Sequence, residues 1–235
     1  PEGMFIQGYT RFVGPNLLEM EDGQRIRAEK IIIATGSRPI VPDAWREYRD
    51  RIITTDEFFE LDVLPRSIAV VGLGVVGLEI GQSLHRLGCE VVGIDMKEAI
   101  GGLSDPEVAK AAIDILGQEF PLWLGQGAEI SEGSNGKLRV SAGENSIEVD
   151  RVFASIGRRP NIDKLGLDLI GAPVDERGFP VYNPNTMQLG DLPVFLAGDV
   201  TGAVKLVQAV HQMVHHEESR GFIRMQARLQ ISFLR

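Results

Sequence analysis

The sequence predicts an α/β fold, on three observations from its middle section. Residues 67–71 form a continuous apolar run, which suits a parallel strand covered on both faces. Residues 75–87 carry apolar side chains at helical spacing, and residues 90–94 form a second apolar run. A strand, a helix and a second strand in this order form a β-α-β unit, which indicates a parallel sheet of the Rossmann type.

A glycine-rich turn connects the first of these strands to the helix. Residues 72–77 read Gly-Leu-Gly-Val-Val-Gly. In this pattern the first glycine permits a tight turn, the second lets the backbone approach a pyrophosphate, and the third allows the helix to pack closely on the strand. The helix N-terminus then offers unpaired N–H groups to an anion. We predict a dinucleotide site here, the alternative being an ordinary loop.

An acid ends the second strand. Asp95 lies 23 residues after Gly72, where a carboxylate accepts hydrogen bonds from ribose hydroxyls and repels a 2′-phosphate. Met96 follows at a position where NADP-binding sites often carry Arg. The sequence therefore favours NAD over NADP, the alternative being that Asp95 is a solvated strand end.

Short strands and one connection precede this unit. We expect a small β-meander over residues 4–6, 11–13, 17–20 and 25–27, bounded by glycine turns. The apolar run at residues 30–34 predicts a parallel strand covered on both faces. Residues 40–66 are expected to be a connection with one short helix near residues 55–59.

A helix and further strands follow the unit. Ser104 and Glu107 have capping-box spacing, with Pro106 in the first turn, so we expect an amphipathic helix over residues 105–120. Short strands are expected at residues 122–124, 128–130, 137–141 and 146–149, with a hairpin turn at residues 134–136. Residues 150–156 and 194–197 are expected to be buried strands.

Composition excludes several classes of function. The net charge is −9 and no long basic run is present, so we expect no nucleic-acid partner. No apolar stretch reaches the roughly 18 residues of a membrane span, so we expect no membrane partner. The one cysteine, Cys89, allows no internal disulfide and no multi-cysteine metal site; it is expected to pack as a small apolar residue. A reducing, cytoplasmic setting fits these features, and the opening Pro1-Glu2-Gly3 suggests a piece of a longer protein.

Four motifs occur in a specific order along the chain. They are Ala34-Thr35-Gly36-Ser37, the glycine-rich turn followed by Leu78-Glu79, Gly157-Arg158-Arg159-Pro160-Asn161 and Ala197-Gly198-Asp199-Val200. With Leu64-Pro65-Arg66-Ser67, they resemble the flavin- and pyridine nucleotide-linked disulfide reductases, and within them the dihydrolipoamide dehydrogenases. The resemblance covers about residues 4–208.

The resemblance implies two cofactor sites. The residues implied in FAD binding are Thr35, Gly36, Ser37 and Asp199, with Lys205, Leu206, Val207 and Gln208 at the start of a helix beneath the flavin. Those implied in NAD binding are Gly72, Leu73, Gly74, Val75, Val76, Gly77, Leu78, Glu79, Asp95, Ile130 and Gly157. Taken singly, the Gly157 motif could be a turn stiffened by Pro160, and Asp199 a helix cap.

The resemblance also implies the domain organisation. Residues 1–64 would be the C-terminal part of a FAD-binding domain, residues 65–157 an inserted NAD-binding Rossmann domain, and residues 158–235 a return to the FAD-binding or central domain with an atypical tail. The family's first FAD motif, its redox-active cysteine pair and its C-terminal dimerisation domain have no counterpart in this sequence. We therefore expect a partial FAD site that does not retain the flavin, and a parent enzyme that is a homodimer.

In the family, a dithiol is oxidised by a redox-active disulfide, electrons pass to FAD, and hydride goes on to NAD. We expect this chain to supply the NAD site and part of the FAD site of such an oxidoreductase, with no catalytic residue of its own and no activity in isolation. Three alternatives remain: a related flavin-linked NADH oxidase or disulfide reductase, a non-catalytic NAD-binding module, and an inactive truncation product. His211 and His215 have zinc-ligand spacing, but Gln212 replaces the expected glutamate, so no metal site is expected.

Overall fold

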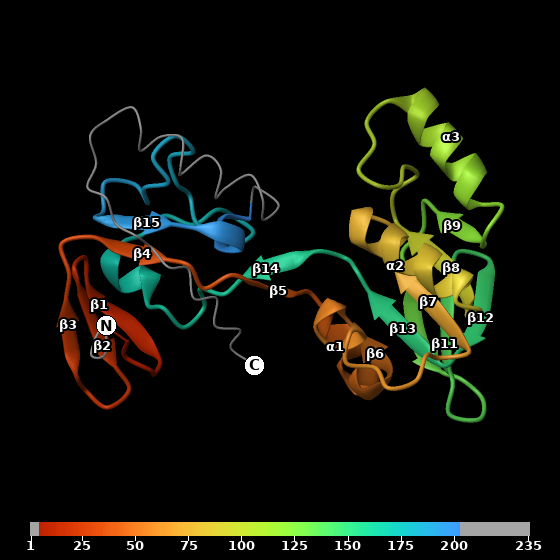
Figure 1. Cartoon of the computed structure of the whole chain (residues 1–235), viewed down its shortest axis with the longest axis horizontal. Coiled ribbons are helices and arrows are strands. Elements are labelled where there is room, and N and C mark those ends of the chain that lie inside the picture. The colour runs from red at the N-terminus through yellow and green to blue at the C-terminus, as the bar shows by residue number, and fades with distance from the viewer. Residues whose placement is uncertain (1–4, 203–235) are drawn as a thin grey trace. The chain divides into compact units, whose positions relative to one another are not determined.

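The computed structural model describes residues 5–202 and divides into two compact units (Figure 1). The central unit is Arg38–Arg159, and the flanking unit combines Pro1–Ser37 with Pro160–Arg235. The sequence-based boundary at residue 65 therefore lies 27 residues inside the central unit, which begins at Arg38.

A five-stranded parallel sheet forms the middle of the central unit (Figure 1). Its order is β6 (Ile52–Ile53), β13 (Arg151–Ala154), β7 (Ser67–Val71), β8 (Glu90–Asp95) and β9 (Leu122–Leu124). Each neighbouring pair is parallel. All five residues of β7 are buried, which confirms the Rossmann-type parallel sheet that the continuous apolar runs predict.

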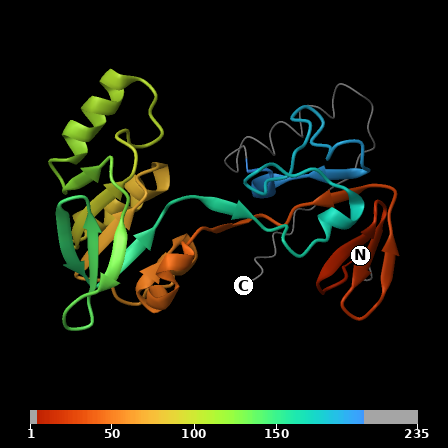
Figure 2. The same cartoon turned by 180° about the vertical axis from the view of Figure 1, so that it is seen from behind.

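Two different layers cover the two faces of this sheet. Ile68 and Val70 of β7 pack with the helices α2 (Val75–Arg86) and α3 (Pro106–Leu116). The alternate residues Ala69 and Val71 pack instead with Trp45 and with an antiparallel sheet, seen from behind in Figure 2. That sheet consists of β10 (Glu129–Glu132), β11 (Leu138–Ala142) and β12 (Asn145–Val149). The alternation follows from the two-residue period of a strand.

The flanking unit is built on two small sheets. The strands β1 (Thr10–Gly14), β2 (Leu17–Met20) and β3 (Arg25–Arg27) form the expected antiparallel meander. The strands β4 (Ile31–Ile33) and β15 (Val194–Leu196) pair in parallel. Their buried residues share a core with Phe12 of β1 and with the 3₁₀ helices η2 (Leu167–Ile170) and η3 (Gly198–Thr201).

Two expectations for the flanking unit are wrong. Phe5 and Ile6 lie in no strand, so the meander begins at β1; Met4 lies outside the described residues. The apolar run of β4 is not covered on both faces, because Ile31 and Ile33 are buried whereas Ile32 is 62% exposed. Alternate residues of a strand face opposite sides, and within residues 5–202 only the side of β4 with Ile31 and Ile33 packs on the core.

The expected connection at residues 40–66 is in fact part of the central unit. It contains the 3₁₀ helix η1 (Asp43–Arg51), the edge strand β6 and the short helix α1 (Thr55–Phe58). The helix was expected, but a two-residue strand is too short to show a period in sequence. The Gly157 motif, for which a turn stiffened by Pro160 was the alternative, contains a strand: β14 (Arg158–Pro160) pairs with β5 (Ser37–Pro39) as a two-stranded ladder.

The helix α3 has a different cap from the one expected. The carboxylate of Asp105 accepts hydrogen bonds from the backbone N–H groups of Glu107 and Val108, at 2.9 and 3.1 Å. Asp105 is therefore the N-cap, Ser104 lies one residue outside the helix, and α3 ends at Leu116 rather than at residue 120.

We expect Asp105→Ala to lower the free energy of unfolding by about 1 kcal/mol, because it removes the acceptor for two helix N–H groups. Ser104→Ala is the matched control and should change it by less than about 0.5 kcal/mol. Urea unfolding followed by circular dichroism measures both. Equal losses in the two variants would contradict the assignment of Asp105 as the cap.

A buried polar contact fixes the start of β7. One carboxylate oxygen of Asp150 accepts hydrogen bonds from the N–H and the hydroxyl of the buried Ser67, at 2.9 and 3.0 Å. Lys137 lies 3.6 Å from the other oxygen. Burial raises the pKa of Asp150, but the hydrogen bonds from Ser67 and the charge of Lys137 outweigh it, so the pKa is lowered.

We expect Asp150→Asn to destabilise the chain most at neutral pH. A lowered native pKa means that the carboxylate contributes stability above its unfolded pKa of about 3.9, and that this contribution is lost as the pH falls through the native pKa. The difference in unfolding free energy between wild type and variant should therefore shrink below about pH 4. Urea titrations at several pH values test this, with the exposed Asp62→Asn as the control; a difference independent of pH would contradict it.

Candidate functional site

The glycine-rich turn lies at the carboxyl end of β7, where three backbone segments meet. A Cβ atom on Gly77 would lie 1.9 Å from the carbonyl oxygen of Gly72. A Cβ atom on Gly72, whose φ is +95°, would lie 2.4 Å from the carbonyl oxygen of Ser155, just after β13. The first and third glycines are therefore required by packing, as the pattern predicts.

The second glycine of the turn has a different environment. Gly74 is the N-cap of the 12-residue helix α2, and, apart from its two chain neighbours, no described residue lies within 4 Å of the position a Cβ would take. Among the described residues, no side chain caps this helix end, and Val75 and Val76 of the first turn are exposed. The first N–H groups of α2 are thus available to an anion, and the open space at Gly74 fits the close approach of a pyrophosphate.

Asp95 binds the turn directly. One of its carboxylate oxygens accepts a hydrogen bond from the N–H of Leu73 at 2.6 Å, and the other accepts one from the N–H of Lys97 at 2.8 Å. A carboxylate has about four acceptor positions, so Asp95 retains capacity for ribose hydroxyls. Its contact with Leu73 was missed from the sequence, because spacing along the chain does not show which backbone group the acid reaches.

A cavity of about 410 Å³ lies beside this acid. Gln126, one of its lining residues, donates its N–H to the carbonyl oxygen of Asp95 at 3.3 Å. The cavity is lined by Gln126, Gly127, Ala128, Glu129, Ser141 and Gly143. Ile130 is the next residue along the chain; it is half-buried in β10 opposite Val140. It adjoins this cavity without lining it.

The other implied NAD residues fall into two groups. Leu73 and Gly77 are buried and Leu78 is half-buried, so they offer a ligand chiefly their backbone. Glu79 is exposed on the second turn of α2. Gly157 has a φ of +126° and its carbonyl oxygen accepts a hydrogen bond from the N–H of Ile40 at 3.0 Å, within the central unit.

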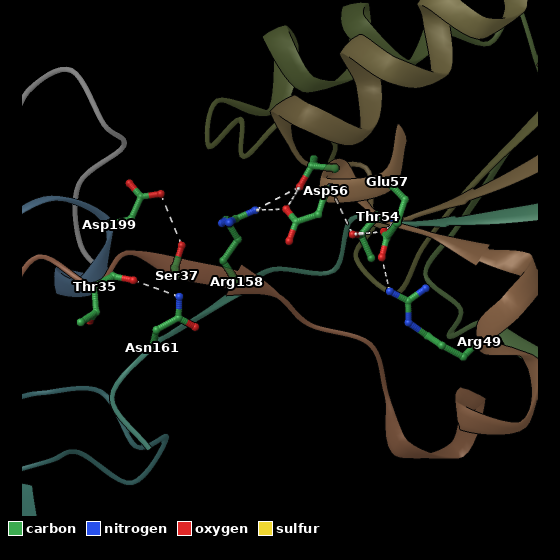
Figure 3. Close-up of polar contacts among 10 residues, drawn as sticks. Thr35, Ser37, Arg49, Thr54, Asp56, Glu57, Arg158, Asn161 and Asp199 are labelled. Carbon is green, nitrogen blue, oxygen red and sulfur yellow. Dashed lines mark hydrogen bonds and ion pairs between the residues drawn. The ribbon is translucent and has the colours of Figure 1, made fainter. Parts of the chain in front are cut away.

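In the flanking unit, three sequence motifs meet through polar contacts (Figure 3). The side-chain amide of Asn161 donates to the carbonyl oxygen of Thr35 at 3.0 Å, and its backbone N–H donates to Gly36 at 3.0 Å. The hydroxyl of Ser37 donates to the carboxylate of Asp199 at 3.3 Å. Of the residues implied in flavin binding, Ser37 and Asp199 are therefore in contact although they are 162 residues apart in sequence. Asp199 is not the N-cap of η3, because that position is held by Ala197.

Arg158 connects the Gly157 motif to α1 within the central unit, a contact that the sequence did not indicate (Figure 3). Its guanidinium donates to the hydroxyl of Thr55 at 3.0 Å and lies 3.9 Å from the carboxylate of Asp56. The same helix start carries a capping box between Thr54 and Glu57. Burial raises the pKa of Glu57, but hydrogen bonds from Thr54 and Arg49 outweigh it and lower the pKa.

Several sequence-based candidates lie elsewhere. Lys205, Leu206, Val207 and Gln208 are outside the described residues, as are His211 and His215. Cys89 is buried in the core beside α2, and burial raises the pKa of its thiol. Within residues 5–202, no group of three or more His, Cys, Asp or Glu side chains could hold a metal ion. No helix in the same range is long and apolar enough to cross a membrane.

Comparison with known proteins assigns the family. A model of the pyridine nucleotide-disulphide oxidoreductase family matches residues 4–214. The chain belongs to this family. It is 34% identical over 184 residues to a dihydrolipoyl dehydrogenase of Cupriavidus necator, covering 74% of this chain and 39% of that protein. It is 31% identical over 202 residues to a mercuric reductase of Staphylococcus aureus, covering 83% of this chain and 36% of that protein.

Solved structures share the fold. The HOCl-induced flavoprotein disulfide reductase RclA from Escherichia coli superposes with a TM-score of 0.80 at 23% identity. The match covers 94% of this chain and 51% of that structure. The chain therefore has the fold of a flavoprotein disulfide reductase over about half of the reductase's length.

Two alanine substitutions in the turn should separate packing from ligand binding. Gly77→Ala should lower the free energy of unfolding by about 2–3 kcal/mol, because its Cβ would overlap the Gly72 carbonyl. Gly74→Ala should change it by less than about 1 kcal/mol and instead weaken NADH binding at least about tenfold, because its Cβ would occupy the open space. Chemical unfolding and calorimetric titration measure the two effects. A Gly74→Ala chain that binds NADH normally would contradict the assigned role of Gly74.

Proposed function

We propose that this chain is the NAD-binding part, and a portion of the FAD-binding part, of a dihydrolipoamide dehydrogenase-like flavoprotein oxidoreductase. The observation that carries the proposal is the arrangement around Gly74. An open helix N-terminus lies beside an acid, Asp95, that is hydrogen-bonded to the same turn. This pair provides partners for both the pyrophosphate and the adenine-side ribose of NAD.

Each cofactor has fitting residues in a different unit. For NAD these are the backbone of residues 72–77, the carboxylate of Asp95 and the backbone of Gly157. For FAD they are Thr35, Ser37 and Asp199, which Asn161 and Gly36 help to hold together. When bound, the flavin and the nicotinamide supply two-electron hydride chemistry. The residues of this chain bind and orient the two cofactors.

We infer a dithiol substrate for the parent protein from the names of its relatives. Several relatives are named dihydrolipoyl dehydrogenase and others mercuric reductase. The chain has one cysteine and it is buried, so we assign the redox-active disulfide to a part of the parent protein outside this sequence. We further propose that the parent is a cytoplasmic homodimer and that this chain alone neither retains flavin nor turns over a dithiol.

A second candidate is a non-catalytic NAD-binding module. The observation that favours it is that one compact unit, Arg38–Arg159, contains the whole glycine-rich turn, Asp95 and the adjoining cavity. Neither proposal expects flavin on the isolated chain, so the parent protein separates them: its absorption spectrum should show a bound flavin at about 450 nm in the first proposal and none in the second. Titration with NADH tests the part that both proposals share.

Asp95 sets the cofactor preference in this proposal. Asp95→Asn removes the charge that repels a 2′-phosphate but keeps one carbonyl oxygen for the turn. We expect the ratio of the NADPH and NADH dissociation constants, measured by calorimetry, to fall at least about tenfold. The exposed Asp62→Asn, which makes the same charge change in the same unit, should leave the ratio unaltered. An unchanged ratio in Asp95→Asn would show that another residue distinguishes NADH from NADPH.

A further inference from the structure

A second cavity lies in the central unit at the amino ends of the parallel strands, away from the glycine-rich turn at their carboxyl ends. Its volume is about 460 Å³, and it is next to the first residues of β7 and β13. The glycine-rich turn follows the carboxyl end of β7, so the two sites are at opposite ends of the strands. The cavity is lined by Leu61, Val63, Leu64, Pro65, Arg66, Asn135, Gly136, Lys137, Asp150 and Arg151.

One wall of this cavity is apolar. It is made by Leu61, Val63, Leu64 and Pro65, on the loop between α1 and β7. Val63 is 80% exposed and Leu64 is also exposed. Apolar side chains next to a cavity favour a ligand with an apolar body, because its burial removes surface from water on both sides.

The charged part of the lining is mostly positive. Lys137, Arg66 and Arg151 line the cavity together with a single acid, Asp150, which already accepts hydrogen bonds from Ser67 and pairs with Lys137. Neither Arg66 nor Arg151 has an ion pair or a side-chain hydrogen bond with any residue in the described range 5–202.

The two arginines are close in the sheet. Arg151 pairs with Ile68 on the adjacent strand, and Arg66 immediately precedes that strand. Two guanidinium groups beside one cavity repel each other unless an anion lies with them. The chain as a whole carries a net charge of −9, so this concentration of positive charge runs against its overall composition.

We propose that this cavity binds an organic carboxylate. Its carboxylate group pairs with Arg66 and Arg151, since guanidinium groups match carboxylate oxygens with two parallel hydrogen bonds. Its apolar body lies against Leu61, Val63 and Leu64. The site is separate from the proposed NAD site and does not depend on it, because none of its lining residues belongs to the glycine-rich turn or to β8.

Titration of the full chain with octanoate, followed by calorimetry, tests the proposal. Octanoate combines a carboxylate with an apolar chain, and we expect it to bind to saturation. Inorganic phosphate has charge without an apolar body, and 1-octanol has the chain without charge; each should bind at least about tenfold more weakly. Failure of octanoate to saturate, or equal binding of phosphate or octanol, would overturn the assignment of an organic carboxylate.

Variants then locate the site. Arg66→Gln and Arg151→Gln should each weaken octanoate binding about tenfold, and Val63→Asp should weaken it as well. Arg46→Gln makes the same charge change on an exposed residue of the same unit that does not line the cavity, and it should bind octanoate like wild type. Circular dichroism confirms that each variant is folded. Octanoate binding that is unchanged in both folded arginine variants, or reduced equally in Arg46→Gln, would overturn the proposal.

Discussion

The central unit depends on backbone contacts that only glycine permits. Gly77 lies so close to the carbonyl of Gly72 that a Cβ would be 1.9 Å from its oxygen, and a Cβ on Gly72 would be 2.4 Å from the carbonyl oxygen of Ser155, just after β13. These contacts join α2, β7 and β13 at one edge of the sheet. The acid at the end of β8 is joined to the same turn by the hydrogen bond from Leu73 to Asp95. A dinucleotide site needs both the first turn of α2 and this acid.

Asp95 links this packing to ligand chemistry. Its carboxylate accepts the N–H groups of Leu73 and Lys97, so it stabilises the turn before any ribose is present. An acid with both roles is pre-organised, since a side chain already held by two hydrogen bonds loses less freedom when it binds a ligand. This is why the asparagine variant, which keeps an acceptor, separates charge from packing better than alanine would.

The features that the sequence predicted are those that depend on hydrophobic period and motif spacing along the chain. The strand β7, the helix α2 and the tight packing at Gly72 and Gly77 follow from period and spacing. The resemblance carried by the four motifs implied one flavin site for Thr35, Ser37 and Asp199, which stays a prediction, and the structure shows Ser37 in contact with Asp199. The strand β6 was missed because two residues carry no period, although both are buried. The cap at Asp105, the exposure of Ile32 and the contacts of Arg158 depend on tertiary neighbours, which no local pattern specifies.

The two proposed cofactor sites fall in different compact units. The glycine-rich turn, Asp95 and Gly157 belong to Arg38–Arg159, whereas Thr35, Ser37, Asn161 and Asp199 belong to the flanking unit. The contacts described above for the proposed NAD site lie within the central unit. We therefore expect NADH binding to require no residue of the proposed flavin site. A chain that binds NADH without flavin is then consistent with a part of a flavoenzyme as well as with an independent module, so only the parent protein's flavin and dithiol chemistry distinguishes the two.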